Sequence, residues 1–306
     1  MHISKYLIFL LISLFSACTF ATSKTTAEIE TSNKNSPPTV TSNNNSQLLQ
    51  NIVQNYLQKT PIKTTETLTL TQAQEVQNLF VLEISKSLGS VVGYKAGLTN
   101  PKAQKIFNVS QPLRGTLLEK MLLENGSVIS GKFASRPVAE GDLILRVGSA
   151  EINNAKTPRE TLKYLDAVIP FLELPDFLYS ENIKLDASAL IATNVGARAG
   201  ILGEPIPLAD TDEWENRLQN LQVEILDENG KVLASGKGSN LLGNPLNVVL
   251  WIKDSLQAEG KELKKGDLLS LGSISRFVPV KSNSTIRARY LDLEPNKTVE
   301  IFVKFE

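Results

Sequence analysis

Cysteine and histidine are almost absent from this sequence, and the chemistry that depends on them is largely excluded. The 306 residues include one Cys and one His, Cys18 and His2, both close to the N-terminus. If a signal peptide is removed, no imidazole and no free thiol remain for catalysis. Ser-His-Asp and Cys-His catalysis, disulfide bonds and His/Cys zinc sites are then excluded. Catalysis must use carboxylates, Lys, Tyr, hydroxyl groups, the backbone, or a hard metal ion with oxygen ligands.

An excess of charge of either sign is also missing. The 32 Lys and Arg residues balance the 32 Asp and Glu residues, so the formal net charge is zero. Because nucleic-acid binding by counterion release needs a basic surface, we expect no nucleic-acid partner. The chain is 42% hydrophobic and 21% charged, as in ordinary globular proteins. Its length allows one large domain or two modest ones.

The N-terminal apolar run is too short to cross a membrane as a helix. Residues 6–17 (YLIFLLISLFSA) fall short of the roughly 20 residues that span a bilayer, but they are typical of a signal peptide. The run ends in FSAC at residues 15–18, which resembles a bacterial lipobox whose Cys is diacylated. We therefore expect a lipoprotein-type signal peptide at residues 1–17. Simple secretion, with cleavage near Ala21, and a retained membrane anchor are the alternatives.

The segment after this run has the composition of a tether. Residues 18–47 are dominated by Ser, Thr and Asn, with two adjacent prolines in the middle. Such a segment buries too little apolar area to offset its ordering entropy, so we expect it to be disordered. The protein would then be exported, anchored by its lipid and facing the periplasm or the cell exterior. Residues 48–306 are expected to form one folded domain.

Helical and strand patterns are mixed along this domain. Apolar spacing predicts helices at residues 48–57 and 71–88, the second opened by a Thr71/Gln74 capping box. Asn-Pro pairs at residues 100–101 and 244–245 predict two more helix starts. The predicted strands are short: 143–147, 169–174, 223–226, 232–234, 268–271 and 299–305. No regular βαβ rhythm is present, so we expect an α+β fold around a β-rich core.

Three carboxylates stand out in this pattern. Glu140 and Asp142 are two residues apart at the start of a predicted strand, so they point to the same face. Glu173 lies in the apolar run at residues 169–174, where an unpaired charge would be costly. Together they could hold Mg²⁺ or Mn²⁺. The alternatives are a solvated acidic pair, an edge-strand Glu, and a surface role for Lys95 in its own apolar run.

Eight segments, in this order, resemble the hydratase and decarboxylase branch of the fumarylacetoacetate hydrolase superfamily. That branch is typified by 2-keto-4-pentenoate hydratase and 4-oxalocrotonate decarboxylase, and the resemblance covers the chain from about residue 48. The segments are VGYKAGLT (92–99), VSQPLRGTL (109–117), EGD (140–142), PFLE (170–173), ATN (192–194), GKGS (236–239), LGNPLN (242–247) and KGD (265–267).

The resemblance implies a curled mixed β-sheet core with flanking helices, commonly homo-oligomeric. It also implies an Mg²⁺ or Mn²⁺ ion that chelates a small 2-keto carboxylic acid. Matched by motif, the metal ligands are Glu140, Asp142 and Glu173. Lys95 is the catalytic residue, whose ammonium orients the substrate and, if its pKa is depressed, exchanges a proton. The expected substrate-binding residues are Asn194, Gly272 and Ser273.

The sequence also departs from the family pattern. Asp142 replaces a Glu, and Leu113 and Arg114 replace an acidic residue and an aromatic one. Leu271 replaces a Thr before Gly272. We therefore expect a metal-dependent lyase of 2-keto (enol) acids, with hydration of 2-keto-4-pentenoate to 4-hydroxy-2-ketovalerate as the prototype and decarboxylation as the other reaction. The alternative is a non-catalytic extracytoplasmic protein that binds small acids with the same fold.

Overall fold

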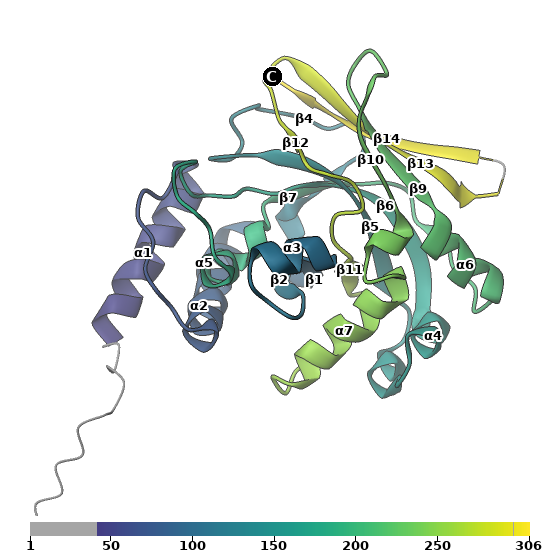
Figure 1. Ribbon diagram of the computed structural model, residues 1–306, viewed down its shortest axis with the longest axis horizontal. Coiled ribbons are helices and arrows are strands. Elements are labelled where there is room, and N and C mark those ends of the chain that lie inside the picture. Colours follow the sequence, from purple (N-terminus) through teal and green to yellow (C-terminus); the bar gives the residue numbers. More distant parts are fainter. Residues whose placement is uncertain (1–41, 296) are drawn as a thin grey trace, which may run out of the picture. The chain divides into compact units, whose positions relative to one another are not determined.

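Two β-sheets and a set of flanking helices make up the fold (Figure 1). This is a computed structural model, and it describes residues 42–295 and 297–306. The expected signal peptide and most of the expected tether lie outside the described residues. One sheet has nine strands and the other has five. The α+β class with a curled mixed sheet is confirmed.

The nine-stranded sheet carries the predicted site residues. Its main path runs β2-β1-β11-β5-β6-β7-β3, with β12 paired to β5 and β8 to β6. Two pairings, β1–β11 and β3–β7, are parallel, and the others are antiparallel. The strands are β1 (Val91–Gly97), β2 (Leu113–Leu118), β3 (Leu122–Glu124), β5 (Val138–Val147), β6 (Leu165–Leu174), β7 (Ala199–Leu202), β8 (Ile206–Pro207), β11 (Leu268–Ser270) and β12 (Val278–Pro279).

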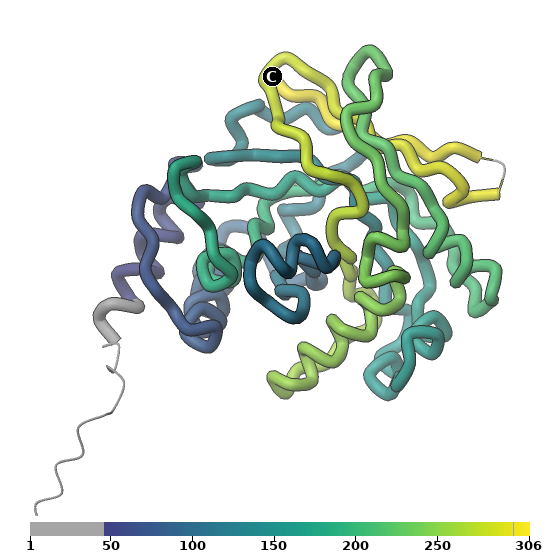
Figure 2. The backbone as a smooth tube through the Cα atoms, in the orientation of Figure 1, coloured from purple at the N-terminus to yellow at the C-terminus, as the bar shows by residue number. Residues whose placement is uncertain are grey.

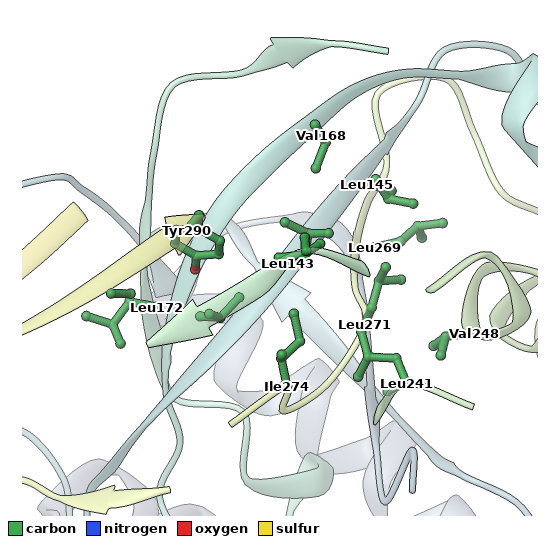
Figure 3. Packing of buried hydrophobic residues seen from close by; sticks show 14 of the residues in the cluster. Leu143, Leu145, Val168, Leu172, Leu241, Val248, Leu269, Leu271, Ile274 and Tyr290 are labelled. Atoms are coloured by element: carbon green, nitrogen blue, oxygen red, sulfur yellow. The ribbon is translucent and has the colours of Figure 1, made fainter. Parts of the chain in front are cut away.

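The five-stranded sheet packs against the larger one through a shared apolar core. Its order is β10 (Val232–Lys237), β9 (Gln222–Leu226), β13 (Ser284–Glu294), β14 (Lys297–Phe305) and β4 (Val128–Ile129). Leu143 and Leu172 of the large sheet meet Tyr290 of β13 in this core, as Figure 3 shows. All three side chains are fully buried. The two sheets are therefore held together directly behind the strands that carry the carboxylates.

Helices α1 and α2 lie side by side, as the path of the chain shows (Figure 2), and they share a second core with α5. Ile52, Phe80 and Ile84 are fully buried in it. No helix in the described part of the chain is long and apolar enough to cross a membrane. The helices are α1 (Ser42–Gln58), α2 (Leu70–Leu88), α3 (Pro101–Ile106), α4 (Pro158–Thr161), α5 (Ala187–Ala192), α6 (Asp212–Asn220) and α7 (Pro245–Gln257).

Local signals predicted the helix starts with small errors. Asn100 and Asn244 cap α3 and α7 as expected, each accepting a hydrogen bond from a backbone N–H of the first turn. The capping box of α2 is formed by Thr69 and Gln72 instead of Thr71 and Gln74. Thr69 and Gln72 have the same residue types and the same spacing as Thr71 and Gln74, so the sequence pattern alone could not decide between the two pairs.

Helix α1 begins at Ser42, so it includes the last six residues of the segment expected to be a tether. Once a helix is nucleated by its packed apolar stripe, each further residue adds one backbone hydrogen bond, so the helix continues into polar sequence. The expected strand at 143–147 also begins earlier, at Val138. Glu140 and Asp142 therefore lie inside β5, where each is paired with a residue of β6.

Candidate active site

Four neighbouring strands bring the predicted charged residues together. β1 carries Lys95, which pairs with Ser270 of β11, and β11 pairs with β5. β5 carries Glu140 and Asp142, and Glu140 lies directly opposite Glu173 of β6. Because side chains alternate along a strand, the three carboxylates project from the same face of the β5–β6 pair.

A buried ion pair joins Lys95 to Glu173. The Lys95 Nζ lies 2.7 Å from Glu173 Oε1, and the two side chains are only 4% and 3% exposed. Lys95 Nζ also donates to the carbonyl oxygen of Val195 at 2.9 Å. The second carboxylate oxygen, Glu173 Oε2, is buried and has no hydrogen-bond partner in the described part of the chain. Such an oxygen is costly to bury unless a further ligand satisfies it.

Asp142 is held from several directions. Its side chain is fully buried, and its Oδ1 accepts the backbone N–H of Leu143 at 2.6 Å and of Leu271 at 3.2 Å. The Ser270 hydroxyl donates to Oδ2. Burial, and then the charge of Glu173, raise the pKa of Asp142 well above its usual value, although these hydrogen bonds oppose the shift.

Glu140 is the carboxylate that would titrate near neutral pH. Burial raises its pKa to about 7, and the neighbouring Glu173 charge adds to that effect. The Lys95 ammonium and a hydrogen bond from Ser273 oppose the shift. At neutral pH the Glu140 carboxyl group can therefore hold or release a proton, which is what a general acid–base group requires.

Lys95 remains an ammonium group in this surrounding. Burial alone lowers its pKa, but the carboxylates of Glu173 and Glu140 outweigh burial, and the net pKa is raised. Burial therefore does not by itself depress the pKa of Lys95, and proton exchange by this residue would need the charge of a bound metal ion as well. Attraction to two nearby carboxylates favours the charged form more than desolvation disfavours it.

The carboxylate oxygens of this site are suitable ligands for a hard divalent cation, although the side chains are not arranged around one common coordination site. In residues 42–295 and 297–306, no group of three or more Asp, Glu, His or Cys side chains is arranged to hold an ion. The free oxygen Glu173 Oε2 and the presence of three carboxyl groups beside one ammonium nevertheless fit a cation, since oxygen ligands are the ones Mg²⁺ and Mn²⁺ prefer. Glu140, Asp142 and Glu173 are the residues that would hold it.

The side chain of Asn194, an expected substrate-binding residue, pairs with the backbone of β2, and its contact with substrate stays a prediction. Its Oδ1 accepts the backbone N–H of Thr116 at 2.7 Å, and its Nδ2 donates to the Thr116 carbonyl at 2.8 Å. The residue has no exposed surface. Asn194 therefore continues the backbone pairing of β2 as a strand would, because an amide side chain carries the same donor and acceptor as a peptide group.

Gly272 and Ser273 lie at the edge of the cluster. Gly272 has φ 95°, and a Cβ there would lie 2.7 Å from both the Ala96 carbonyl oxygen and the Thr99 hydroxyl oxygen, so only glycine fits. Ser273 follows directly and hydrogen-bonds the carboxyl of Glu140. A contact of Gly272 or Ser273 with substrate stays a prediction.

Sequence reasoning missed three residues of the site. Ser270 binds Asp142, and its position as the polar residue of an apolar run could have marked it. Tyr290 accepts from Phe171 N at 2.9 Å, and its hydroxyl lies 2.8 Å from the Asp142 carbonyl oxygen. No local sequence pattern connects Tyr290 with Asp142 or Phe171.

Val195 is the third missed residue, and its backbone is strained. Its φ is 53°, and Asn194 before it has φ 56°. The left-handed region is unfavourable for a β-branched residue. This turn aims the Val195 carbonyl at the Lys95 ammonium. Only the glycine that follows, Gly196 with φ 70°, hinted at such a turn in the sequence.

Three of the departures from the family pattern, at Leu113, Arg114 and Leu271, place their side chains outside the group of Lys95, Glu140, Asp142 and Glu173. Arg114 lies opposite Ala96 in the β1–β2 ladder, so its side chain points away from the Lys95 face. It pairs with Glu259 at 2.6 Å and with Ser255 at 2.8 Å, both near the C-terminal end of α7. Leu113 and Leu271 are each buried in an apolar core.

Sequence comparison finds named relatives over most of the folded part. The 2-keto-4-pentenoate hydratase of Paraburkholderia xenovorans is 30% identical over 198 residues, which are 64% of this chain and 71% of the relative. The chain belongs to the hydratase and decarboxylase branch of the fumarylacetoacetate hydrolase superfamily. A 4-oxalocrotonate decarboxylase of Pseudomonas putida in the same branch is 28% identical over 204 residues, 66% of this chain and 75% of the relative. No family model matches the sequence.

Structure comparison gives the same fold. The structure of a 4-oxalocrotonate decarboxylase from Pseudomonas putida, complexed with magnesium and adipate, has a TM-score of 0.76 at 24% identity. The match covers 88% of this chain and 100% of that structure, so the fold is shared over its whole length. Because its relatives in this branch are hydratases and decarboxylases, we assign the chain to the lyases of this family.

Proposed function

We propose that this protein is a divalent-metal-dependent lyase of small 2-keto (enol) carboxylic acids. Hydration of 2-keto-4-pentenoate to 4-hydroxy-2-ketovalerate is the prototype. The observation that carries the proposal is the unsatisfied Glu173 Oε2, buried beside Lys95, Glu140 and Asp142. The names of the relatives and the magnesium in the related decarboxylase structure support it.

Each group in the cluster has a part in this reaction. A bound Mg²⁺ or Mn²⁺ would polarise the substrate carboxylate and 2-oxo group as a Lewis acid. The Lys95 ammonium attracts the carboxylate or enolate oxygen of the substrate and fixes its orientation. Glu140, with a pKa of about 7, holds a proton on its carboxyl group that it can give up when a cation or substrate arrives.

Most of the cluster is shielded from solvent, and Glu140 is its partly exposed member. Lys95, Asp142 and Glu173 are all buried. Two surface hollows, of about 410 and 360 Å³, are lined by other parts of the chain. In a dry site the Lys95 charge acts on the substrate more strongly than it would in water.

Metal titration combined with a substrate screen tests the proposal. Mn²⁺ and Mg²⁺ should raise the melting temperature of the wild type, by mass action on the folded state. Glu173→Gln should lose this response, whereas Glu300→Gln, which changes a partly exposed ion pair on β14, should keep it. Unsaturated 2-keto acids should then be turned over with metal. A melting temperature indifferent to both metals would remove the metal site.

Metal binding without turnover of any 2-keto acid would instead support the non-catalytic alternative. The residues that suggested this alternative, Leu113, Arg114 and Leu271, do not contribute a side chain to the carboxylate–lysine cluster. Their substitution therefore gives no reason to expect loss of activity.

A further inference from the structure

An arginine without an ion-pair partner lies beyond the carboxylate–lysine cluster. The Arg136 guanidinium stacks on the Phe177 ring at 5.0 Å and donates to the Tyr179 carbonyl at 3.3 Å. Within the described part of the chain it pairs with no carboxylate. The neighbouring Asp176 accepts backbone N–H groups instead. Most donors of this half-buried guanidinium are thus left for another acceptor.

The strand register places Arg136 on the face of the cluster. The antiparallel pairing that sets Glu140 opposite Glu173 continues beyond both strands through a bridge at Pro137. Phe177 N then donates to the Arg136 carbonyl at 3.4 Å, so these two residues are opposite each other. Alternation of side chains puts Arg136 and Phe177 on the same face as Glu140. At 3.2–3.4 Å per residue, the four residue steps from Arg136 to Glu140 span roughly 13 Å along the strand.

The aromatic rings of Phe177 and Phe277 lie between Arg136 and Glu140 on this face. β12 pairs Val278 with Ala139, which places Phe277 beside Glu140. The Phe277 ring meets the Phe177 ring edge-on, with centroids 5.5 Å apart. Phe277 is 53% exposed although it is a large apolar residue. The face thus presents an acid-and-lysine end, an apolar middle and a cationic end.

We propose that Arg136 binds the distal carboxylate of a dicarboxylic 2-keto acid, while the Phe177 and Phe277 rings contact its hydrocarbon chain. A guanidinium can bind a carboxylate through two parallel hydrogen bonds, and stacking on Phe177 holds its plane in place. A substrate with an uncharged tail would leave these donors unused. The inference rests on the proposed function, because the Lys95 end must bind the first carboxylate.

Two acids of equal carbon number test the subsite. Adipate carries a second carboxylate and hexanoate does not, and their affinities can be measured by calorimetry with Mg²⁺ present. Wild type should prefer adipate by at least about tenfold, the ratio that one extra charge-assisted contact gives. Arg136→Gln should bring this ratio close to one and leave hexanoate affinity unchanged. Arg276→Gln, an exposed arginine next to Phe277, should keep the preference.

Arg136→Lys provides a variant that keeps the charge, and it should retain part of the preference. Equal binding of both acids by wild type would overturn the subsite, and so would an undiminished preference in Arg136→Gln. If 2-keto monoacids are turned over while wild type shows no preference, only the subsite fails. If no metal binds and no 2-keto acid reacts, the proposed function fails and this inference fails with it.

Discussion

Lys95 is the residue on which the proposed chemistry and the local stability both depend. In Lys95→Met the buried Glu173 loses its cation, and breaking a buried pair typically costs about 3–5 kcal/mol. Turnover of a 2-keto-4-enoic acid should fall at least about 10²-fold, the loss typical of removing one positioned donor that stabilises developing negative charge. Metal affinity should stay near the wild-type value or become slightly tighter, because a nearby positive charge is gone.

The double variant Lys95→Met/Glu173→Gln supplies the control. It removes both charges and should recover most of the lost stability in urea unfolding, but not the activity. Full activity in Lys95→Met would show that this lysine is only structural.

Glu140 should make the stability of the metal-free protein depend on pH. Its pKa is 4.5 as a free group and about 7 in the fold, so between these values the folded state binds the proton more tightly. Stability should therefore fall as the pH rises through this range. Glu140→Gln cannot titrate and should be more stable than wild type at about pH 8 in EDTA, when both are measured by urea unfolding. Equal slopes of stability against pH in both proteins would contradict this.

Among the strands, the β1–β11 pairing leaves no space for a side chain at Gly93. A Cβ at this position would lie 1.9 Å from the Leu268 carbonyl oxygen. Gly93→Ala should force the two strands apart and destabilise the protein by at least about 3 kcal/mol, the range for severe overpacking. Val91→Ala, at an exposed position of the same strand, should cost less than about 1 kcal/mol. Similar urea midpoints for the two variants would show that the strands can adjust.

Elements with local signals were predictable from sequence, and those without them were not. α7 has an Asn cap, a proline in its first turn and an apolar stripe within thirteen residues. β13 has buried and partly buried side chains in alternation, with Arg287 and Arg289 on its other face, so its apolar content is too low to mark it. The three carboxylates and Lys95 were found through motif and pattern.

The contacts that complete the cluster come from distant parts of the sequence. Val195 meets Lys95 across 100 positions, and Ser270 meets Asp142 across 128. Spacing within a segment carries no information about such pairs. The pairing of Asn194 with Thr116 could not be predicted for the same reason, because the two residues lie 78 positions apart.

For the molecule as a whole, we propose export as a lipoprotein, anchored through Cys18. Cys18→Ser should block lipid attachment, so the protein should be released or mislocalised when cells are fractionated. Membranes that still hold an unprocessed Cys18→Ser chain would instead indicate a retained anchor. Assembly into a homo-oligomer stays a prediction, which size-exclusion chromatography with light scattering can measure.

The Tyr290 hydroxyl has a consequence for how the protein unfolds. It comes from the five-stranded sheet and contacts the backbone of Asp142 and Phe171 in the other sheet. Local opening of β13 must therefore release the strand that carries two of the three carboxylates. Amide hydrogens of β5 and β13 should exchange with deuterium together, as one cooperative unit. A protein of this design would lose its activity in the same step in which β13 of the five-stranded sheet opens.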